Sequence, residues 1–138
     1  MNKFVSFEGI GYMAATFPVS EATQTALKKD HLNAQTGNVD VNGKKLAVKL
    51  NEDGTVGFGT GAATDVLLGI LIAYEMDGFA SVQLKGGVDE VPTAAELTAG
   101  NKALVVNAKG EIVVNEAGRK TDVVAPSKAD SLFASIVL

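Results

Sequence analysis

The sequence predicts a mainly β protein, a small β-barrel or sandwich built from two related hairpin units. Three observations predict it. Apolar runs of strand length alternate with tight-turn pairs such as Asp77-Gly78, which is typical of β-hairpins. Fifteen glycines, no tryptophan and many Val, Ala and Thr residues suit short strands joined by tight turns. The second half of the chain also repeats the pattern of the first half. We expect an extended N-terminal arm and at most one short helix beside this body.

Length and charge narrow the classes of function. A chain of 138 residues is one domain by size and can bury a sufficient core without disulfide or metal cross-links. It has no cysteine, so disulfides and thiolate metal sites are excluded. The net charge is −4, no basic block is present, and Arg119 is the single arginine. These features argue against nucleic-acid binding, which needs clustered Lys and Arg.

No stretch of the sequence indicates a membrane span or a signal peptide. The apolar run at residues 66–74 is too short to cross a bilayer. The N-terminal residues have no continuous apolar core followed by a cleavage signal. We therefore expect a soluble, unprocessed protein that does not contact a membrane.

The N-terminal segment, residues 1–17, holds half of the aromatic residues of the chain. Glycines interrupt it and no helical period runs through it, so it is predicted to be extended. It is either a first strand within the protein's own sheet or an arm that lies along another subunit by strand addition. As an arm it would be anchored by its large apolar side chains, which are Phe4, Phe7, Tyr12, Met13 and Phe17.

A short helix or an irregular connection follows Pro18. Ser20 is a suitable N-cap, Glu21 falls in the first turn, and Lys28 and Lys29 fall in the last. This arrangement of charge favours a helix. The apolar stripe is weak, so both alternatives stay open.

A polar linker, residues 33–42, leads into the body. We therefore divide the chain into an N-terminal arm and linker at residues 1–42 and a β-rich body at residues 43–138.

Three hairpins are predicted in the body, because turn pairs separate its apolar runs. The run at 66–74 is long enough to be a buried helix, but Gly69 in its middle and the Asp-Gly pair after it favour a strand. Pro92 argues against an interior strand between 88 and 100. Two more strands, 123–125 and 132–138, complete the chain. The turns are at Asp53-Gly54, Asp77-Gly78 and Lys109-Gly110.

An internal repeat relates the two halves of the body. Thr64-Asp65-Val66 and FASVQL at 79–84 match Thr121-Asp122-Val123 and FASIVL at 133–138, in the same order after a matching hairpin. The repeat predicts two four-strand units that pack together, because neither buries its apolar face alone. Phe79 and Phe133 should then occupy equivalent, largely buried positions about a pseudo-two-fold axis.

No arrangement of residues indicates catalysis, a cofactor or a metal. The glycine-rich stretch 57–62 resembles a dinucleotide fingerprint, but no helix or βαβ context follows it. His31 is the single histidine, and no nucleophile motif accompanies it. We expect no enzyme activity.

Small groups of carboxylates occur without the spacing of a calcium loop. Glu52-Asp53 and Asp89-Glu90 are therefore expected to be solvated turn residues. Asp65 and Asp122 recur in the repeat, and Thr-Asp before a strand is typical of a turn bonded to its own backbone.

Two stretches of the body resemble the bacteriophage capsid decoration, or cement, proteins. The first is VLLGILIAYEMDGFASVQLKGGVDEVP at 66–92. The second is TAGNKALVVNAKGEIVV at 98–114 with TDVVAPSKADSLFASIVL after it. The family usually reads Ile-Gly-Val-Ala before the last hairpin, where this chain has Val123-Val124-Ala125-Pro126.

The resemblance implies a tulip-like β body and a non-enzymatic virion protein on the outer capsid surface. Its partners would be the major capsid protein and itself, as a homotrimer at three-fold and quasi-three-fold positions. It would be made in the host bacterial cytoplasm and would stabilise the shell by bridging capsomers, with no nucleic acid bound. The residues expected at the capsid are Phe4, Phe7, Tyr12, Met13 and Phe17.

Two alternatives remain beside this hypothesis. A carbohydrate-binding or host-attachment module on a virion surface would need exposed aromatic residues, whereas Tyr74, Phe79 and Phe133 lie in predicted strands. A small hydrolase is disfavoured by the single histidine and the absence of cysteine.

Overall fold

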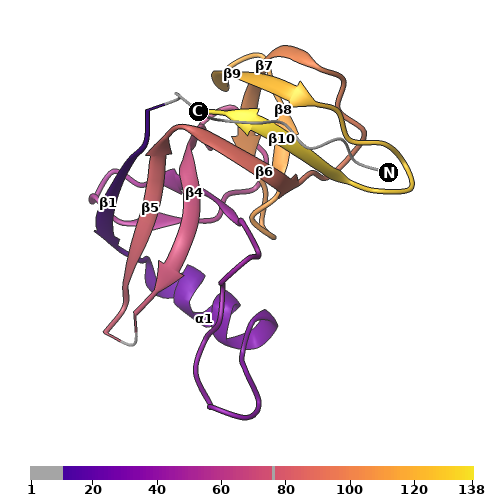
Figure 1. Cartoon of the computed structure of the whole chain (residues 1–138). Coiled ribbons are helices and arrows are strands. Elements are labelled where there is room, and N and C mark those ends of the chain that lie inside the picture. Colours follow the sequence, from indigo (N-terminus) through magenta and orange to yellow (C-terminus); the bar gives the residue numbers. More distant parts are fainter. Residues whose placement is uncertain (1–10, 76) are drawn as a thin grey trace.

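The computed structural model describes residues 11–75 and 77–138, which form ten strands and one helix. Two antiparallel five-strand sheets make up the protein, and the helix lies at one end of the first sheet (Figure 1). The mainly β class is confirmed, and the two sheets are consistent with a sandwich. Phe4 and Phe7 lie outside the described residues.

The first sheet has the strand order β1-β5-β4-β2-β3. Together with the residues that connect its strands it forms the N-terminal unit, residues 11–85. Its strands are β1 (Met13–Pro18), β2 (Ala47–Leu50), β3 (Val56–Gly57), β4 (Leu67–Tyr74) and β5 (Phe79–Lys85).

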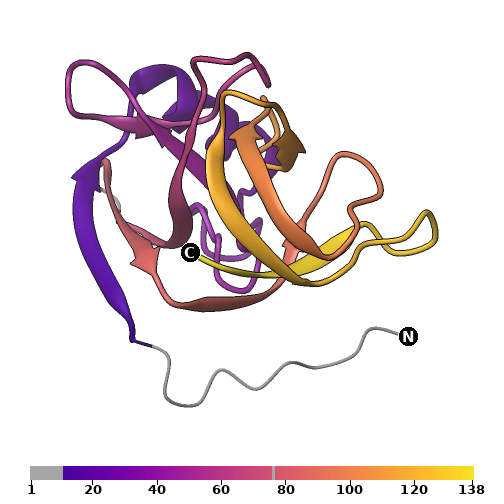
Figure 2. The same cartoon turned by 90° about the horizontal axis from the view of Figure 1, so that it is seen from above.

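The second sheet has the order β6-β10-β9-β7-β8 and forms the C-terminal unit, residues 87–138. Gly86 alone separates β5 from β6, so the chain passes directly from one sheet to the other, as Figure 2 shows from above. The strands are β6 (Gly87–Pro92), β7 (Gly100–Val106), β8 (Ile112–Val114), β9 (Arg119–Ala125) and β10 (Phe133–Val137).

The two sheets have the same topology, because adding five to each strand number of the first order gives the second. The registers agree as well: Pro18 pairs with Phe79 in the first sheet, and Pro92 pairs with Phe133 in the second. The residue after each proline donates its backbone N–H to the residue before each phenylalanine, at 2.8 and 2.9 Å. The internal repeat therefore includes β1 and β6, one strand more per unit than the sequence indicated.

The three predicted hairpins are present. β2 pairs with β3, β4 with β5, and β7 with β8, all antiparallel. Gly54, Gly78 and Gly110 have positive φ angles of 87°, 87° and 77°, which glycine adopts without steric cost. The residues 66–74 are thus a strand from Leu67 on, and the helical alternative is wrong. Pro92 ends β6, which lies at a sheet edge, where proline is tolerated.

The helix α1 spans Glu21–Asp30 and begins as the sequence predicts. The Ser20 hydroxyl accepts a hydrogen bond from the Thr23 N–H at 3.4 Å. Leu27 is fully buried in the core of the N-terminal unit.

The core consists of two clusters, one in each unit. The cluster of the N-terminal unit gathers side chains of β2, β4 and β5 around Leu27 and Val41. The cluster of the C-terminal unit also takes in Ala47, Leu67 and Ile70, which belong to the N-terminal unit. The two units therefore share buried side chains along β4.

Part of the segment set apart from the body, residues 1–42, belongs to the first sheet. Met13–Pro18 pairs with β5 along its length, so these residues are a strand of the protein's own sheet. Phe17 and Val41 contact the core of the N-terminal unit. Of the two alternatives that the sequence left open for residues 1–17, a first strand within the protein's own sheet is therefore correct for Met13–Pro18.

Phe79 and Phe133 are equivalent, as predicted, but they are not buried. Their exposed fractions are 43% and 44%. Side chains alternate between the two faces of a strand, and the inward positions belong to the next residues, Ala80 and Ala134, at 0% and 1%. The prediction of buried phenylalanines is wrong for this reason.

Candidate functional site

Two exposed large apolar side chains lie at the start of the edge strand β1, and one of them, Tyr12, is the most exposed large apolar side chain of the described residues. Tyr12 is 66% exposed and Met13 is 50% exposed. β1 pairs only with β5 along its length, so its second edge carries backbone groups that no strand of the described chain covers. Such an edge is able to accept a further strand.

A pocket of about 300 Å³ lies beside these two side chains. Lys85, Gly86 and Leu138 line its other side. The backbone N–H of Leu138 donates to the Gly86 carbonyl at 2.9 Å, which holds the last residue of the chain at the junction of the two units. The pocket therefore joins the start of β1 to the crossing between the sheets.

Of the three expected capsid-binding residues that the structure describes, two lie together. Tyr12 and Met13 share the pocket at the start of β1. Phe17, near the far end of the strand, is half-buried and packs against the core of the N-terminal unit. The Phe17 ring therefore helps to pack β1 against the core of the N-terminal unit.

The equivalent edge strand, β6, carries charged residues that β1 lacks, although both strands have an irregular register with their neighbours. Its register with β10 shifts between Ala134 and Ile136, and Glu90 has a positive φ of 55°. The Ser135 hydroxyl donates to the Asp89 carboxylate at 2.8 Å, and Lys45 donates to the Asp89 carbonyl. A bulge and charges are the usual protection of a sheet edge. β1 contains no charged residue.

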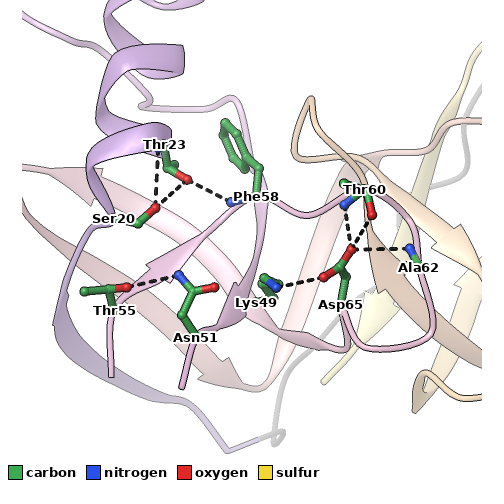
Figure 3. A network of polar contacts seen from close by, with 9 residues as sticks. All are labelled: Ser20, Thr23, Lys49, Asn51, Thr55, Phe58, Thr60, Ala62 and Asp65. Carbon is green, nitrogen blue, oxygen red and sulfur yellow. Dashed lines mark hydrogen bonds and ion pairs between the residues drawn. The ribbon is translucent and has the colours of Figure 1, made fainter. Parts of the chain in front are cut away.

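A buried ion pair closes the glycine-rich loop (Figure 3). Lys49 Nζ donates to Asp65 Oδ1 at 2.7 Å, and the Asp65 side chain is 6% exposed. Asp65 Oδ2 accepts from the backbone N–H groups of Thr60 at 2.6 Å and Ala62 at 3.3 Å. The hydrogen bond from Lys49 and those from the loop hold the pKa of Asp65 well below its usual range.

The same contacts show why residues 57–62, which resemble a dinucleotide fingerprint in sequence, differ from a phosphate-binding loop. A phosphate cradle needs backbone N–H groups that point at the ligand, and here the carboxylate of Asp65 takes those of Thr60 and Ala62. The loop is therefore bonded to its own chain, and the prediction of a turn rather than a phosphate site holds.

A second network in Figure 3 fastens α1 to the strand that precedes this loop. Thr23 Oγ1 accepts hydrogen bonds from the Ser20 hydroxyl at 2.9 Å and from the Phe58 N–H at 3.1 Å. A Cβ atom at Gly57 would lie 2.4 Å from Thr23 Oγ1. The close approach of helix and strand therefore requires glycine at this position.

The single histidine, His31, is the C-cap residue of α1. His31 is half-buried, and burial lowers its pKa. Within residues 11–75 and 77–138, no group of three or more His, Asp and Glu side chains is placed to hold a metal ion. In the same residues, no helix has the length and apolar character needed to cross a membrane.

A larger cleft, of about 530 Å³, lies between the two units. Leu46 and Phe58 line it from the N-terminal unit, and Pro92 and Phe133 line it from the C-terminal unit. Four charged side chains also line it, and we call them its rim: Asp30, Lys44, Lys109 and Glu111. The sequence did not reveal this cleft, because it required Phe133 to be exposed and the two units to be placed side by side.

Comparisons of the chain with known proteins found no similar protein. No protein-family model matches the chain, and neither the curated proteins nor the solved structures contain a match.

Proposed function

We propose that this chain is a structural virion protein that binds the outer surface of a phage head and stabilises the shell by bridging capsomers. The resemblance of residues 66–92, 98–114 and 121–138 to capsid decoration proteins supports the assignment. The single structural observation that carries it is the uncharged, open edge of β1 with Tyr12 and Met13 exposed at its start.

The binding element in this proposal is β1 together with the residues that precede it. A strand of the major capsid protein adds to the open edge, and main-chain hydrogen bonds then supply affinity. Tyr12 and Met13 supply apolar contacts, since aromatic and methionine side chains are enriched in protein interfaces. Phe4 and Phe7 extend the same apolar segment in the sequence.

The mechanism is mechanical rather than chemical. A shell under internal pressure fails when capsomers separate, and a decoration protein that contacts several of them loses its contacts if they part. Many weak copies act together through avidity. A homotrimer at the three-fold positions would multiply the contacts of each chain. A net charge of −4 suits a protein that faces solvent outside the shell.

The test removes the binding residues without removing β1. We expect a chain lacking residues 1–10 and carrying Tyr12→Ser and Met13→Ser to fold normally and to lose attachment to purified expanded heads in sedimentation. Deleting residues 1–17 would be a poor test, because it strips β1 from β5 and takes Phe17 from the core.

The matched control is Leu32→Ser, an apolar side chain of comparable exposure, 51%, in the connection after α1. This variant should decorate heads at full occupancy. The proposal would be overturned if the variant altered in residues 1–13 occupied heads as fully as the wild type. It would also be overturned if the Leu32→Ser control lost attachment to the same extent.

A second candidate function is a carbohydrate-binding or host-attachment module. The sequence disfavoured it, because the aromatic residues of the body were expected inside strands. The 44% exposure of Phe133 at the cleft removes that objection. The two functions use different faces, so one does not exclude the other.

A further inference from the structure

The cleft between the units is assembled from both halves of the repeat. Leu46 precedes β2, Phe58 follows β3, Pro92 ends β6 and Phe133 begins β10. Its volume of about 530 Å³ falls within the range of roughly 300–1,000 Å³ found for small-molecule sites. Because four separate segments meet here, the cleft exists only in the folded, two-unit protein.

The Phe58 ring of the cleft is fixed in place by the fold. A Cβ atom at Gly110 would lie 2.8 Å from Phe58 Cε1 and 3.1 Å from Leu46 Cβ. The turn between β7 and β8 thus packs closely against the Phe58 ring. Phe133 pairs with Pro92 across the strand ends and remains 44% exposed. A ring held as Phe58 is held offers a binding face with little ordering cost, and the exposed Phe133 ring lines the same cleft.

The charges on the rim of the cleft balance. The two positive charges of Lys44 and Lys109 equal in number the two negative charges of Asp30 and Glu111. His31 also lines the cleft, and burial favours its neutral form. The Glu111 carboxylate is held by the Asn107 side chain, which donates to it at 2.9 Å. The rim therefore offers hydrogen-bond donors and acceptors without a net charge.

We propose that this cleft binds a neutral, hydroxyl-rich ring, a pyranose sugar, between its aromatic lining and its charged rim. A ligand with net charge would meet as many like charges as opposite ones. A wholly apolar ligand would cover the rim groups without replacing their bonds to water, which costs free energy. A sugar ring has an apolar C–H face for Phe133 and Phe58 and hydroxyl groups that both donate and accept.

The internal repeat supplies a matched control for this site. Phe79 occupies the position equivalent to Phe133, pairs with Pro18 as Phe133 pairs with Pro92, and has nearly the same exposure, 43%. It does not line the cleft. Replacing either phenylalanine therefore removes the same side chain from the same register, and only one of the two replacements alters the site.

The experiment is a titration of the full, isotopically labelled chain with neutral methyl pyranosides, followed by amide NMR shifts. The panel contains methyl glycosides of glucose, galactose, mannose and N-acetylglucosamine at millimolar concentrations. We expect saturable shifts at Gly43, Gly110 and Glu111 for at least one sugar. Phe133→Ser should weaken that binding by about tenfold, and Phe79→Ser should leave it unchanged.

A second variant keeps the test valid if the melting curve of Phe133→Ser shows that this variant is unfolded. Lys109→Ala removes a rim donor at an exposed turn, where only the backbone N–H of Lys109 bonds to Asn107, and should weaken binding several-fold. Absence of saturable shifts, equal weakening by Phe79→Ser, or tighter binding of a charged methyl glucuronide would each overturn the proposal. Attachment to phage heads should survive Phe133→Ser, so failure here leaves the capsid-binding proposal standing.

Discussion

Asp65 shows how a single carboxylate organises a loop. Its two oxygens bind Lys49 on one side and the backbone of Thr60 and Ala62 on the other. The side chain is almost wholly buried, and Lys49 is 22% exposed. A buried charge is tolerated when hydrogen bonds replace its water, and the loop provides them. Asp122, its counterpart in the repeat, instead accepts a hydrogen bond from Asn101 at an exposed position.

Replacing this carboxylate should destabilise the protein in a pH-dependent manner. We expect Asp65→Asn to lower the free energy of unfolding by about 3 kcal/mol at pH 7, because it leaves the Lys49 ammonium without its partner. The folded-state pKa of Asp65 is depressed, so its contribution is fully present above about pH 4. The contribution falls by roughly 1.4 kcal/mol for each pH unit below that value, as the unfolded chain takes up the proton.

Urea denaturation at pH 7 and pH 3 measures both effects. The difference between the wild type and Asp65→Asn should be smaller at pH 3. Asp122→Asn is the control, since Asp122 is the counterpart of Asp65 in the repeat and its exposed carboxylate accepts a hydrogen bond from Asn101. A difference of the same size at both pH values would refute the role given to the Asp65 charge.

The two exposed phenylalanines should contribute little to stability. We expect Phe79→Ser and Phe133→Ser each to cost less than about 1 kcal/mol, because each ring is already more than two fifths exposed. Val82→Ala, at a fully buried position of β5, should cost more than either. Thermal melts compare the three variants, and a cost near 3 kcal/mol for either serine variant would mean that its ring is buried in solution.

At the scale of elements, the docking of α1 depends on one hydroxyl. Thr23 is 5% exposed and accepts the Phe58 N–H. Thr23→Val keeps the shape but leaves that N–H without an acceptor, so we expect a loss of about 1–3 kcal/mol. Thr25→Val is the control, because the Thr25 hydroxyl bonds within the helix at an exposed site. Equal melting temperatures of the two variants would show that the bond carries no stability.

The hairpins were predictable because their information is local. Each has a glycine with a positive φ angle between two apolar runs, and the helix start at Ser20 is equally local. A turn residue and its neighbours decide such elements whatever the rest of the chain does. The repeat was visible for the same reason, since Thr-Asp-Val and Phe-Ala-Ser recur within it.

The edge strands and the sites were harder, because they depend on partners distant in the sequence. Met13–Pro18 has no turn signal linking it to β5, which begins sixty-one residues after Pro18. The burial of Phe79 and Phe133 was misjudged because hydrophobicity alone does not say which face of a strand is inward. The cleft depends on the exposure of Phe133 and on the placement of the two units side by side, and neither is encoded locally.

At the scale of the molecule, the two units are not independent. Leu67 and Ile70 of β4 lie in the core of the C-terminal unit. Arg119 of β9 donates to the carbonyls of Leu68 at 2.6 Å and Leu84 at 3.2 Å in the other unit. The C-terminal unit therefore completes both its apolar core and its polar contacts with residues from the N-terminal unit.

Residues 87–138 should consequently fail to fold when produced alone. We expect a far-ultraviolet dichroism spectrum without the β signature and no cooperative melt, because the isolated unit lacks the side chains of Leu67 and Ile70. Mixing the fragment with residues 1–86 is the control and should restore the spectrum. A cooperative transition in the isolated fragment would show that each unit is a separate domain.

The ends of the described chain lie close together, since Gly11 and Leu138 both contact Gly86 and line one pocket. A short linker is therefore long enough to join these two ends. A circular permutant that joins Leu138 to Gly11 through a short flexible linker and opens the chain at the exposed turn 34–37 should fold. Its melting temperature should be close to that of the natural order, and a failure to melt cooperatively would show that the junction at Gly86 does not tolerate closure.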